Sequence, residues 1–170
     1  MEEVKRDGPQ LEDITDLVHR IQSLLPVEEA ARTCVLSKSW LHAWSTIPTL
    51  RFYKPKRLVS KEEETNRMNS IDRTVQRYSQ HNIPIETFDL ELRMENQELT
   101  SLANKWIQIV ATNTCLKELS LKISNDIDSK IKLTLTDELF SGENLHSIAI
   151  IVDNYSRNGG VLVTRNPVIN

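Results

Sequence analysis

The sequence predicts an α+β chain, in which a short helical unit is followed by an α/β solenoid of parallel strands with helices on the outside. Two observations lead to this prediction. On both sides of Pro26, apolar residues recur at the three- and four-residue spacing of amphipathic helices. Farther along the chain, segments of alternating apolar and polar residues recur about every thirty residues, which is typical of architectures that place one strand in each repeat.

The helical unit is organised around Pro26. Because proline lacks a backbone N–H and has a fixed φ, it ends the preceding helix and suits the start of the next, so two helices meet at a corner. Asp13 is placed to cap the first helix, and Ser37 to cap a third short helix that Pro48 ends. Three helices of this length bury little apolar surface alone, so the sequence predicts that a partner or a following domain covers them.

A connector and an amphipathic helix come next. Residues 53–59 have no sustained period, which is typical of a connector. Ser60 and Glu63 then have the spacing of a capping box. The apolar face of the helix that follows consists of Met68, Ile71, Val75 and Tyr78.

The rest of the chain alternates between strand and helix patterns. Strands are predicted over 85–92, 116–123 and 145–152. A second helix is predicted over 99–110, and a third repeat unit begins with the apolar residues between Leu133 and Phe140. Asn158-Gly159 predicts a turn into one more edge strand over 161–163, paired as a hairpin.

The residues around Pro26 also carry a specific motif. A Leu-Pro corner is followed by an Ala-Arg-Thr segment, a Val-Leu-Ser-Lys segment, two tryptophans and a Pro-x-Leu-x-Phe exit. In this sequence those elements are Leu25-Pro26, 31–33, 35–38, Trp40, Trp44 and 48–52. This stretch resembles the F-box, in the variety common in plants. The segments 83–92 and 139–145 resemble the first strand and a repeat junction of plant F-box leucine-rich-repeat proteins, so the resemblance extends to about residue 152.

The resemblance implies a fold and a division into domains. The fold is a three-helix F-box followed by a short leucine-rich-repeat arc of parallel strands. The domains are an F-box helical domain over 8–52, a linker and amphipathic helix over 53–83, a leucine-rich-repeat-like region over 84–152 and an irregular tail over 153–170.

The resemblance also implies a function without catalysis. F-box proteins of this kind serve as substrate-receptor subunits of an SCF-type (Skp, cullin, F-box) E3 ubiquitin ligase. The F-box binds a Skp-type adaptor, and through it a cullin, while the repeats bind a protein substrate, which the sequence does not identify. The adaptor-binding residues implied here are Ile14, Leu17, Ile21, Leu24, Leu25, Pro26, Val35, Leu36 and Trp40.

Two departures from the family pattern leave other interpretations open. Asp13-Ile14 stands where the F-box pattern has Leu-Pro, which weakens one adaptor contact. The repeat array is also short, whereas solenoids need about three units and a polar cap. The alternatives are a non-catalytic repeat scaffold with a degenerate F-box, or a non-functional truncated relative. For any single apolar residue of the helical unit, a place in the core is as well supported as a place in an interface.

Composition agrees with a soluble interaction protein of the cytoplasm, the nucleus or both. A formal net charge of -3, with both signs interspersed, provides no basic face for nucleic acid. No stretch is long and apolar enough to span a membrane, and no secretory leader is recognisable. Cys34 and Cys115 lie in apolar patterns and are expected to be reduced core thiols.

No catalytic or metal site is expected. The four histidines lie in different segments without a second ligand nearby. The sequence contains no nucleophile elbow and no glycine loop for phosphate, so no cofactor is expected either.

Overall fold

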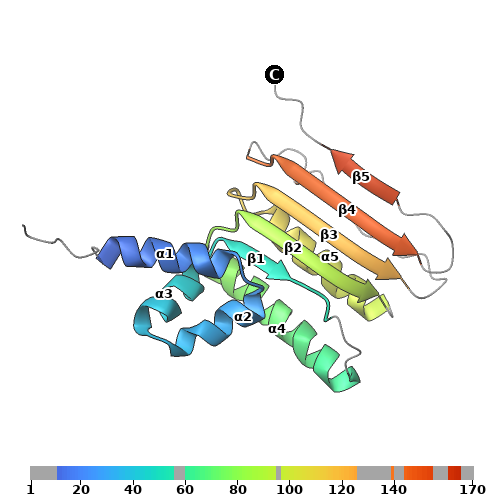
Figure 1. Ribbon diagram of the computed structural model, residues 1–170. Helices are drawn as coiled ribbons and strands as arrows, with labels where there is room; N and C mark the ends of the chain where they lie inside the picture. The colour runs from blue at the N-terminus through green and yellow to red at the C-terminus, as the bar shows by residue number, and fades with distance from the viewer. Residues whose placement is uncertain are drawn as a thin grey trace, which may run out of the picture. The chain divides into compact units, whose positions relative to one another are not determined.

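The computed structural model describes residues 11–55, 60–94, 97–125, 139, 144–154 and 161–165 (Figure 1). The chain divides into two compact units, Met1–Ile47 and Pro48–Asn170, which we call the helical unit and the sheet unit. The described residues form five α-helices and a sheet in which four strands are parallel. The predicted combination of helices with parallel strands is therefore confirmed, whereas the predicted domain boundaries stay a prediction.

Three α-helices and one 3-10 turn make up the described part of the helical unit. They are α1 (Leu11–Ser23), α2 (Val27–Arg32), the 3-10 turn η1 (Thr33–Val35) and α3 (Lys38–Thr46). Pro26 stands directly before α2 with a φ of -56°, and the backbone N–H of Trp40 donates to Ser37 Oγ at 3.4 Å. The predicted corner and the predicted cap of the third helix are both confirmed.

The first helix starts earlier than the sequence analysis predicts. Because α1 begins at Leu11, Asp13 lies within the helix, and the prediction that it caps the helix is wrong. The physical reason is periodicity: Leu11 stands three residues before Ile14 and so belongs to the same helical pattern.

A buried glutamine joins the elements of the helical unit. The Gln22 side chain is fully buried, and its Nε2 donates to Thr33 Oγ1 at 2.7 Å and to the Trp40 carbonyl at 3.1 Å. The Thr33 hydroxyl donates in turn to the carbonyl of Ala30 at 2.6 Å. A buried polar group with partners on two other elements fixes their register, because any shift would leave it unpaired.

The sheet unit contains five described strands in the order β1-β2-β3-β4-β5. Their bounds are β1 (Thr49–Phe52), β2 (Thr87–Met94), β3 (Glu118–Asn125), β4 (Ser147–Asn154) and β5 (Val161–Arg165). The first four are parallel, and β5 pairs antiparallel with β4, which confirms the predicted edge strand. The turn residues Asn158-Gly159 lie outside the described residues. Most of the apolar residues predicted to begin the third repeat, between Leu133 and Phe140, also lie outside the described residues. Of these, Leu139 is described, and it is buried.

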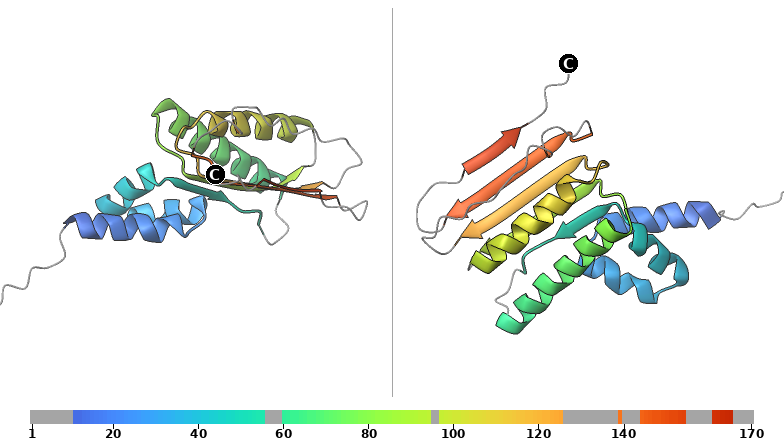
Figure 2. Two further views of the ribbon diagram at one scale, coloured as in Figure 1. Left: turned by 90° about the horizontal axis from the view of Figure 1, so that it is seen from above. Right: turned by 180° about the vertical axis from the view of Figure 1, so that it is seen from behind.

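Two helices cover one face of this sheet. They are α4 (Lys61–Gln80) and α5 (Gln97–Ala111), and Figure 2 shows both on the same side. The predicted capping box is confirmed, since the Ser60 N–H donates to Glu63 Oε2 at 2.9 Å and the Glu63 N–H to Ser60 Oγ at 3.1 Å. The strand residues that alternate onto the covered face are buried: Leu50, Phe52, Phe88, Leu90, Leu92, Leu119, Leu121, Ile123, Ile148 and Ile150.

The parallel strands are joined by the same backbone pattern three times. The carbonyl of Pro48 accepts from Glu86 and Thr87, that of Glu86 from Lys117 and Glu118, and that of Lys117 from His146 and Ser147. Each carbonyl thus takes two N–H groups from the start of the next strand. The strands consequently enter the sheet in one repeated register.

Asparagine side chains strengthen two of these junctions. Asn113 Oδ1 accepts from the N–H groups of Ile85 and Cys115, each at 3.2 Å, and its Nδ2 donates to the Ile83 carbonyl at 3.1 Å. Asn144 Nδ2 donates to the Thr114 carbonyl at 2.8 Å. Each asparagine therefore ties the turn before its strand to the turn before the preceding strand.

Asp72, on α4, links this helix to α5. Its Oδ1 accepts from Trp106 Nε1 at 2.9 Å and from Lys105 Nζ at 3.1 Å, and its Oδ2 accepts from Gln76 Nε2 at 2.6 Å. Burial raises the pKa of Asp72, but the hydrogen bonds from Trp106 and Lys105 outweigh it and hold the pKa below its ordinary value. The charged carboxylate is thus the form that the fold stabilises.

This lowered pKa predicts a loss of stability in acid. The stability that Asp72 contributes is complete above about pH 4, the ordinary carboxyl range, and is lost as the pH falls through the lowered pKa. Urea unfolding from neutral to acidic pH should show this decline for the wild-type protein and a smaller one for Asp72→Asn. Identical declines in both proteins would contradict the assignment.

Candidate functional site

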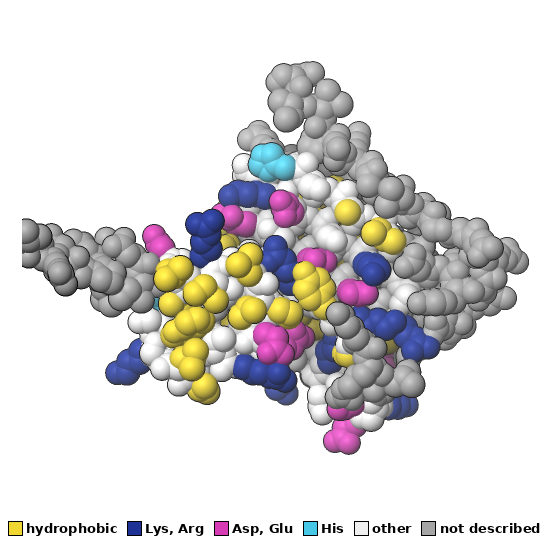
Figure 3. Space-filling model, viewed as in Figure 1, with side chains coloured by type: hydrophobic (Ala, Val, Ile, Leu, Met, Phe, Trp, Pro, Cys, Tyr) yellow, Lys and Arg dark blue, Asp and Glu magenta, His cyan; other side chains and the backbone are white. Residues whose placement is uncertain are grey.

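Large apolar side chains are exposed on the helical unit. Val35 is 87% exposed, Leu24 73%, Leu36 63%, Leu17 57%, Leu41 52% and Ile21 38%, and we call these six residues the apolar patch. Figure 3 shows hydrophobic side chains gathered over this unit. Exposed apolar clusters of this kind mark sites of protein interaction.

Helix geometry explains why these residues are exposed. Leu17, Ile21 and Leu24 lie three and four residues apart and so share one face of α1. On the neighbouring face, Val18 and Gln22 are buried. The helix therefore has more apolar surface than its own unit covers, and burial of one such side chain in a partner is worth about 2 kcal/mol.

The other contributions to the apolar patch come from η1 and α3. Val35 and Leu36 stand at the end of η1, and Leu41 belongs to α3. Gln22 bonds to Thr33 at the start of η1 and to the Trp40 carbonyl in α3, so the three elements that carry the patch are held together from within. The patch is consequently presented by a pre-organised scaffold.

Five of the nine predicted adaptor-binding residues are exposed in the apolar patch, namely Leu17, Ile21, Leu24, Val35 and Leu36. Leu25, Pro26 and Trp40 are half-buried. Ile14 lies in α1, but its side chain is outside the described residues. The contact role of all nine stays a prediction. Leu41 was not predicted, although it stands directly after Trp40 in the same motif.

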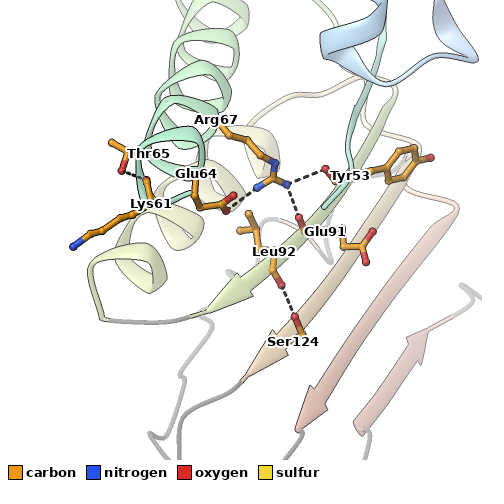
Figure 4. Close-up of polar contacts among 8 residues, drawn as sticks. All are labelled: Tyr53, Lys61, Glu64, Thr65, Arg67, Glu91, Leu92 and Ser124. Carbon is orange, nitrogen blue, oxygen red and sulfur yellow. Dashed lines mark hydrogen bonds and ion pairs between the residues drawn. The ribbon is translucent and has the colours of Figure 1, made fainter. Parts of the chain in front are cut away.

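A second feature lies at the end of β1, where Arg67 of α4 reaches the sheet. Its Nη2 donates to the carbonyl of Glu91 at 2.8 Å and to that of Tyr53 at 3.2 Å, and its Nη1 pairs with Glu64 Oε1 at 3.2 Å (Figure 4). The Arg67 side chain is only 9% exposed. β1 stops at Phe52, whereas β2 continues beyond the paired residues. Past that point the Arg67 guanidinium takes the place of a neighbouring strand as the hydrogen-bond donor to the carbonyls of Tyr53 and Glu91.

Arg67 thereby fixes the backbone of Tyr53 and Glu91. The side chains of these two residues belong to the sheet face opposite α4 and α5. Glu91 Oε1 pairs with Lys122 Nζ at 3.2 Å across β2 and β3. Tyr53 is 42% exposed, and Asp89 on the neighbouring strand β2 acts on its hydroxyl. Burial and the negative charge of Asp89 raise the pKa of the Tyr53 hydroxyl, which therefore remains a donor.

The described residues hold no group of three or more histidine, cysteine, aspartate or glutamate side chains able to bind a metal ion. Neither Cys34 nor Cys115 is in a disulfide. Cys115 is exposed in the turn before β3, so its predicted place in the core is wrong, because the apolar alternation begins only at Leu116. Among the described residues, no helix has the length and apolar character needed to cross a bilayer.

Curated proteins of Arabidopsis thaliana are similar to this chain. One, provisionally named an FBD-associated F-box protein, is 30% identical over 121 residues, which cover 71% of this chain and 28% of the relative. Another, provisionally named an F-box/FBD/LRR-repeat protein, is 34% identical over 113 residues, or 58% of this chain and 24% of the relative. A third, provisionally named an F-box/LRR-repeat protein, is 26% identical over 109 residues, which cover 64% of this chain and 24% of the relative.

The chain spans about a quarter of the length of these relatives. No family model matches the chain, and no solved structure is significantly similar to it. The named relatives nevertheless agree with one another and with the motif around Pro26. They support a plant F-box/leucine-rich-repeat-type protein and confirm the resemblance found in the sequence.

Proposed function

We propose that this protein is the substrate-receptor subunit of an SCF-type E3 ubiquitin ligase. In this proposal the helical unit is a three-helix F-box that binds a Skp-type adaptor, and through it a cullin. The sheet unit is a short leucine-rich-repeat arc that binds a protein target. The protein works in the cytoplasm, the nucleus or both, where it raises the local concentration of a target near the ubiquitin carrier and performs no chemistry itself.

The exposure of the apolar patch is the observation that carries this proposal. The motif implied nine contact residues, and five of them project from the helical unit as exposed apolar side chains. A folded unit that leaves so many large apolar residues uncovered needs a partner surface of the same character. The names of the relatives, all of which include the term F-box, support an adaptor of the Skp type as that partner.

Co-expression with a Skp-type adaptor tests the proposal. The two proteins should co-purify through size-exclusion chromatography in equal amounts, as a stable complex does. A soluble and folded wild-type chain that elutes without the adaptor would contradict the receptor function. That result would favour the alternative of a repeat scaffold with a degenerate F-box.

Leu41 should contribute to adaptor binding although the motif did not indicate it. Its side chain is 52% exposed in α3, next to the half-buried Trp40. We expect Leu41→Ala to weaken adaptor binding about tenfold, since one buried apolar contact is lost. Isothermal titration with the purified adaptor measures this loss. An unchanged dissociation constant would place Leu41 outside the interface.

A further inference from the structure

We propose that, when no adaptor is bound, a second copy of this chain covers the α1 part of the apolar patch, through antiparallel packing of α1 against α1 of the second copy. Self-association and adaptor binding then use the same surface and exclude one another. This inference rests on the proposed function only in its last step, in which the adaptor displaces the second copy.

The charges beside the apolar stripe of α1 are the first observation. Asp16 and Arg20 are both exposed and stand four residues apart, so they lie on one side of the stripe that contains Leu17 and Ile21. Neither side chain forms an ion pair with another described residue. Two charges of opposite sign are therefore free to meet a partner at the edge of the apolar patch.

Antiparallel pairing matches these charges to a second copy of themselves. A two-fold axis at the level of Val18 sets Asp16 of each copy beside Arg20 of the other, because both charges lie on the same side of α1. Two identical ion pairs form in this way. An edge with charges of one sign would repel its own copy, whereas this edge is complementary to itself.

The same pairing also interdigitates the apolar side chains. Leu17 of one copy then lies between Leu17 and Ile21 of the second copy, about 3 Å along the helix axis from each. Side chains that alternate along the axis fill the gaps between one another, as in other packed helix pairs. Leu17 is 57% exposed and Ile21 38%, so both have surface left to bury (Figure 3). The charges and the apolar spacing thus favour one and the same arrangement.

The size of the contact makes the dimer reversible. Because α1 has 13 residues, a contact along it buries less than the roughly 1,200 Å² of a stable protein interface, so we expect weak association. An adaptor that covers the whole apolar patch buries more apolar surface and displaces the second copy by mass action. The second copy therefore shields the apolar patch until the adaptor arrives.

Charge reversal tests the pairing, with sedimentation velocity of the full chain as the measurement. The wild type should dimerise in a dilution series up to about 100 μM, and less at high salt. Asp16→Arg and Arg20→Asp should each weaken the dimer about tenfold, since both ion pairs become repulsive. An equimolar mixture of the two variants should regain association as a heterodimer, because each contact again joins opposite charges. Arg73→Asp makes the same charge change at an exposed position of α4 and should associate as the wild type does.

Three outcomes would overturn the proposed dimer. They are a wild type that stays monomeric over the dilution series, single variants that associate normally, and a mixture of folded variants that associates no better than each variant alone. Circular dichroism establishes that the variants are folded.

Addition of purified adaptor tests the displacement step. The wild-type dimer should convert into complexes with one copy of each protein, and an adaptor complex that still contains the α1 pair would contradict mutual exclusion. A chain that dimerises as expected but does not bind the adaptor would contradict the proposed function and the displacement step. The charge-reversal experiment contains no adaptor, so the two failures are distinguishable.

Discussion

Leu24→Asp combined with Val35→Asp should abolish co-purification with the Skp-type adaptor. The two side chains are 73% and 87% exposed, so charged replacements cost the isolated fold little. In an interface, each lost apolar contact costs about 2 kcal/mol, and the new carboxylates would be buried without partners. We therefore expect adaptor affinity to fall by about a thousandfold. Titration calorimetry with the purified adaptor gives the magnitude.

The control adds one carboxylate, half the charge of the double variant, at a polar position of the same unit. His42 is exposed in α3, and its described contacts use only the backbone carbonyl, so His42→Asp should bind the adaptor as the wild type does. Circular dichroism should show equal helix content for all these proteins. If the double variant binds normally, the apolar patch is not the adaptor interface.

Asn113→Ala should produce the largest loss of stability among single substitutions at the repeat junctions. The change removes three hydrogen bonds and leaves the N–H of Ile85, a residue only 1% exposed, without its described partner. The cost of an unpaired buried donor together with the other lost bonds is about 3 kcal/mol. Urea unfolding followed by circular dichroism should show this as a lower transition midpoint.

Asn144→Ala is the comparison for that prediction. Asn144 makes one described side-chain hydrogen bond, at an exposed position, so its loss should cost about 1 kcal/mol. Asn113→Asp keeps the acceptor atoms but loses the donor to Ile83, and its stability should lie between wild type and Asn113→Ala. Equal losses for Asn113→Ala and Asn144→Ala would show that the buried N–H of Ile85 is satisfied in another way.

The sequence predicted those helix starts, strands and turns whose signals lie within a few neighbouring residues. Pro26 and Ser37 mark helix starts because their effects act within one turn, and the capping box of Ser60 and Glu63 does the same. The strands β2 and β3 were visible because one covered face imposes alternation on each of them. The hairpin strand β5 was visible through its turn residues.

What the sequence did not reveal depends on contacts between distant residues. β1 was missed because the motif placed 48–52 in the F-box exit, although Leu50 and Phe52 alternate with Thr49 and Arg51. The burial of Gln22 depends on Thr33 and on the Trp40 carbonyl, which only the fold brings to it. The role of Arg67 depends in the same way on two carbonyls from separate strands. Polar residues with tertiary partners look like surface residues in a sequence.

The order of the strands has a consequence for how the sheet unit assembles. Every described strand pairs only with the described strands next to it in the chain, and successive partners among the parallel strands are about thirty to forty residues apart. Each pairing step therefore closes a loop of similar and modest length, at a similar entropic cost. Folding can begin at any one pair and spread to the next, without a single long closure that limits the rate.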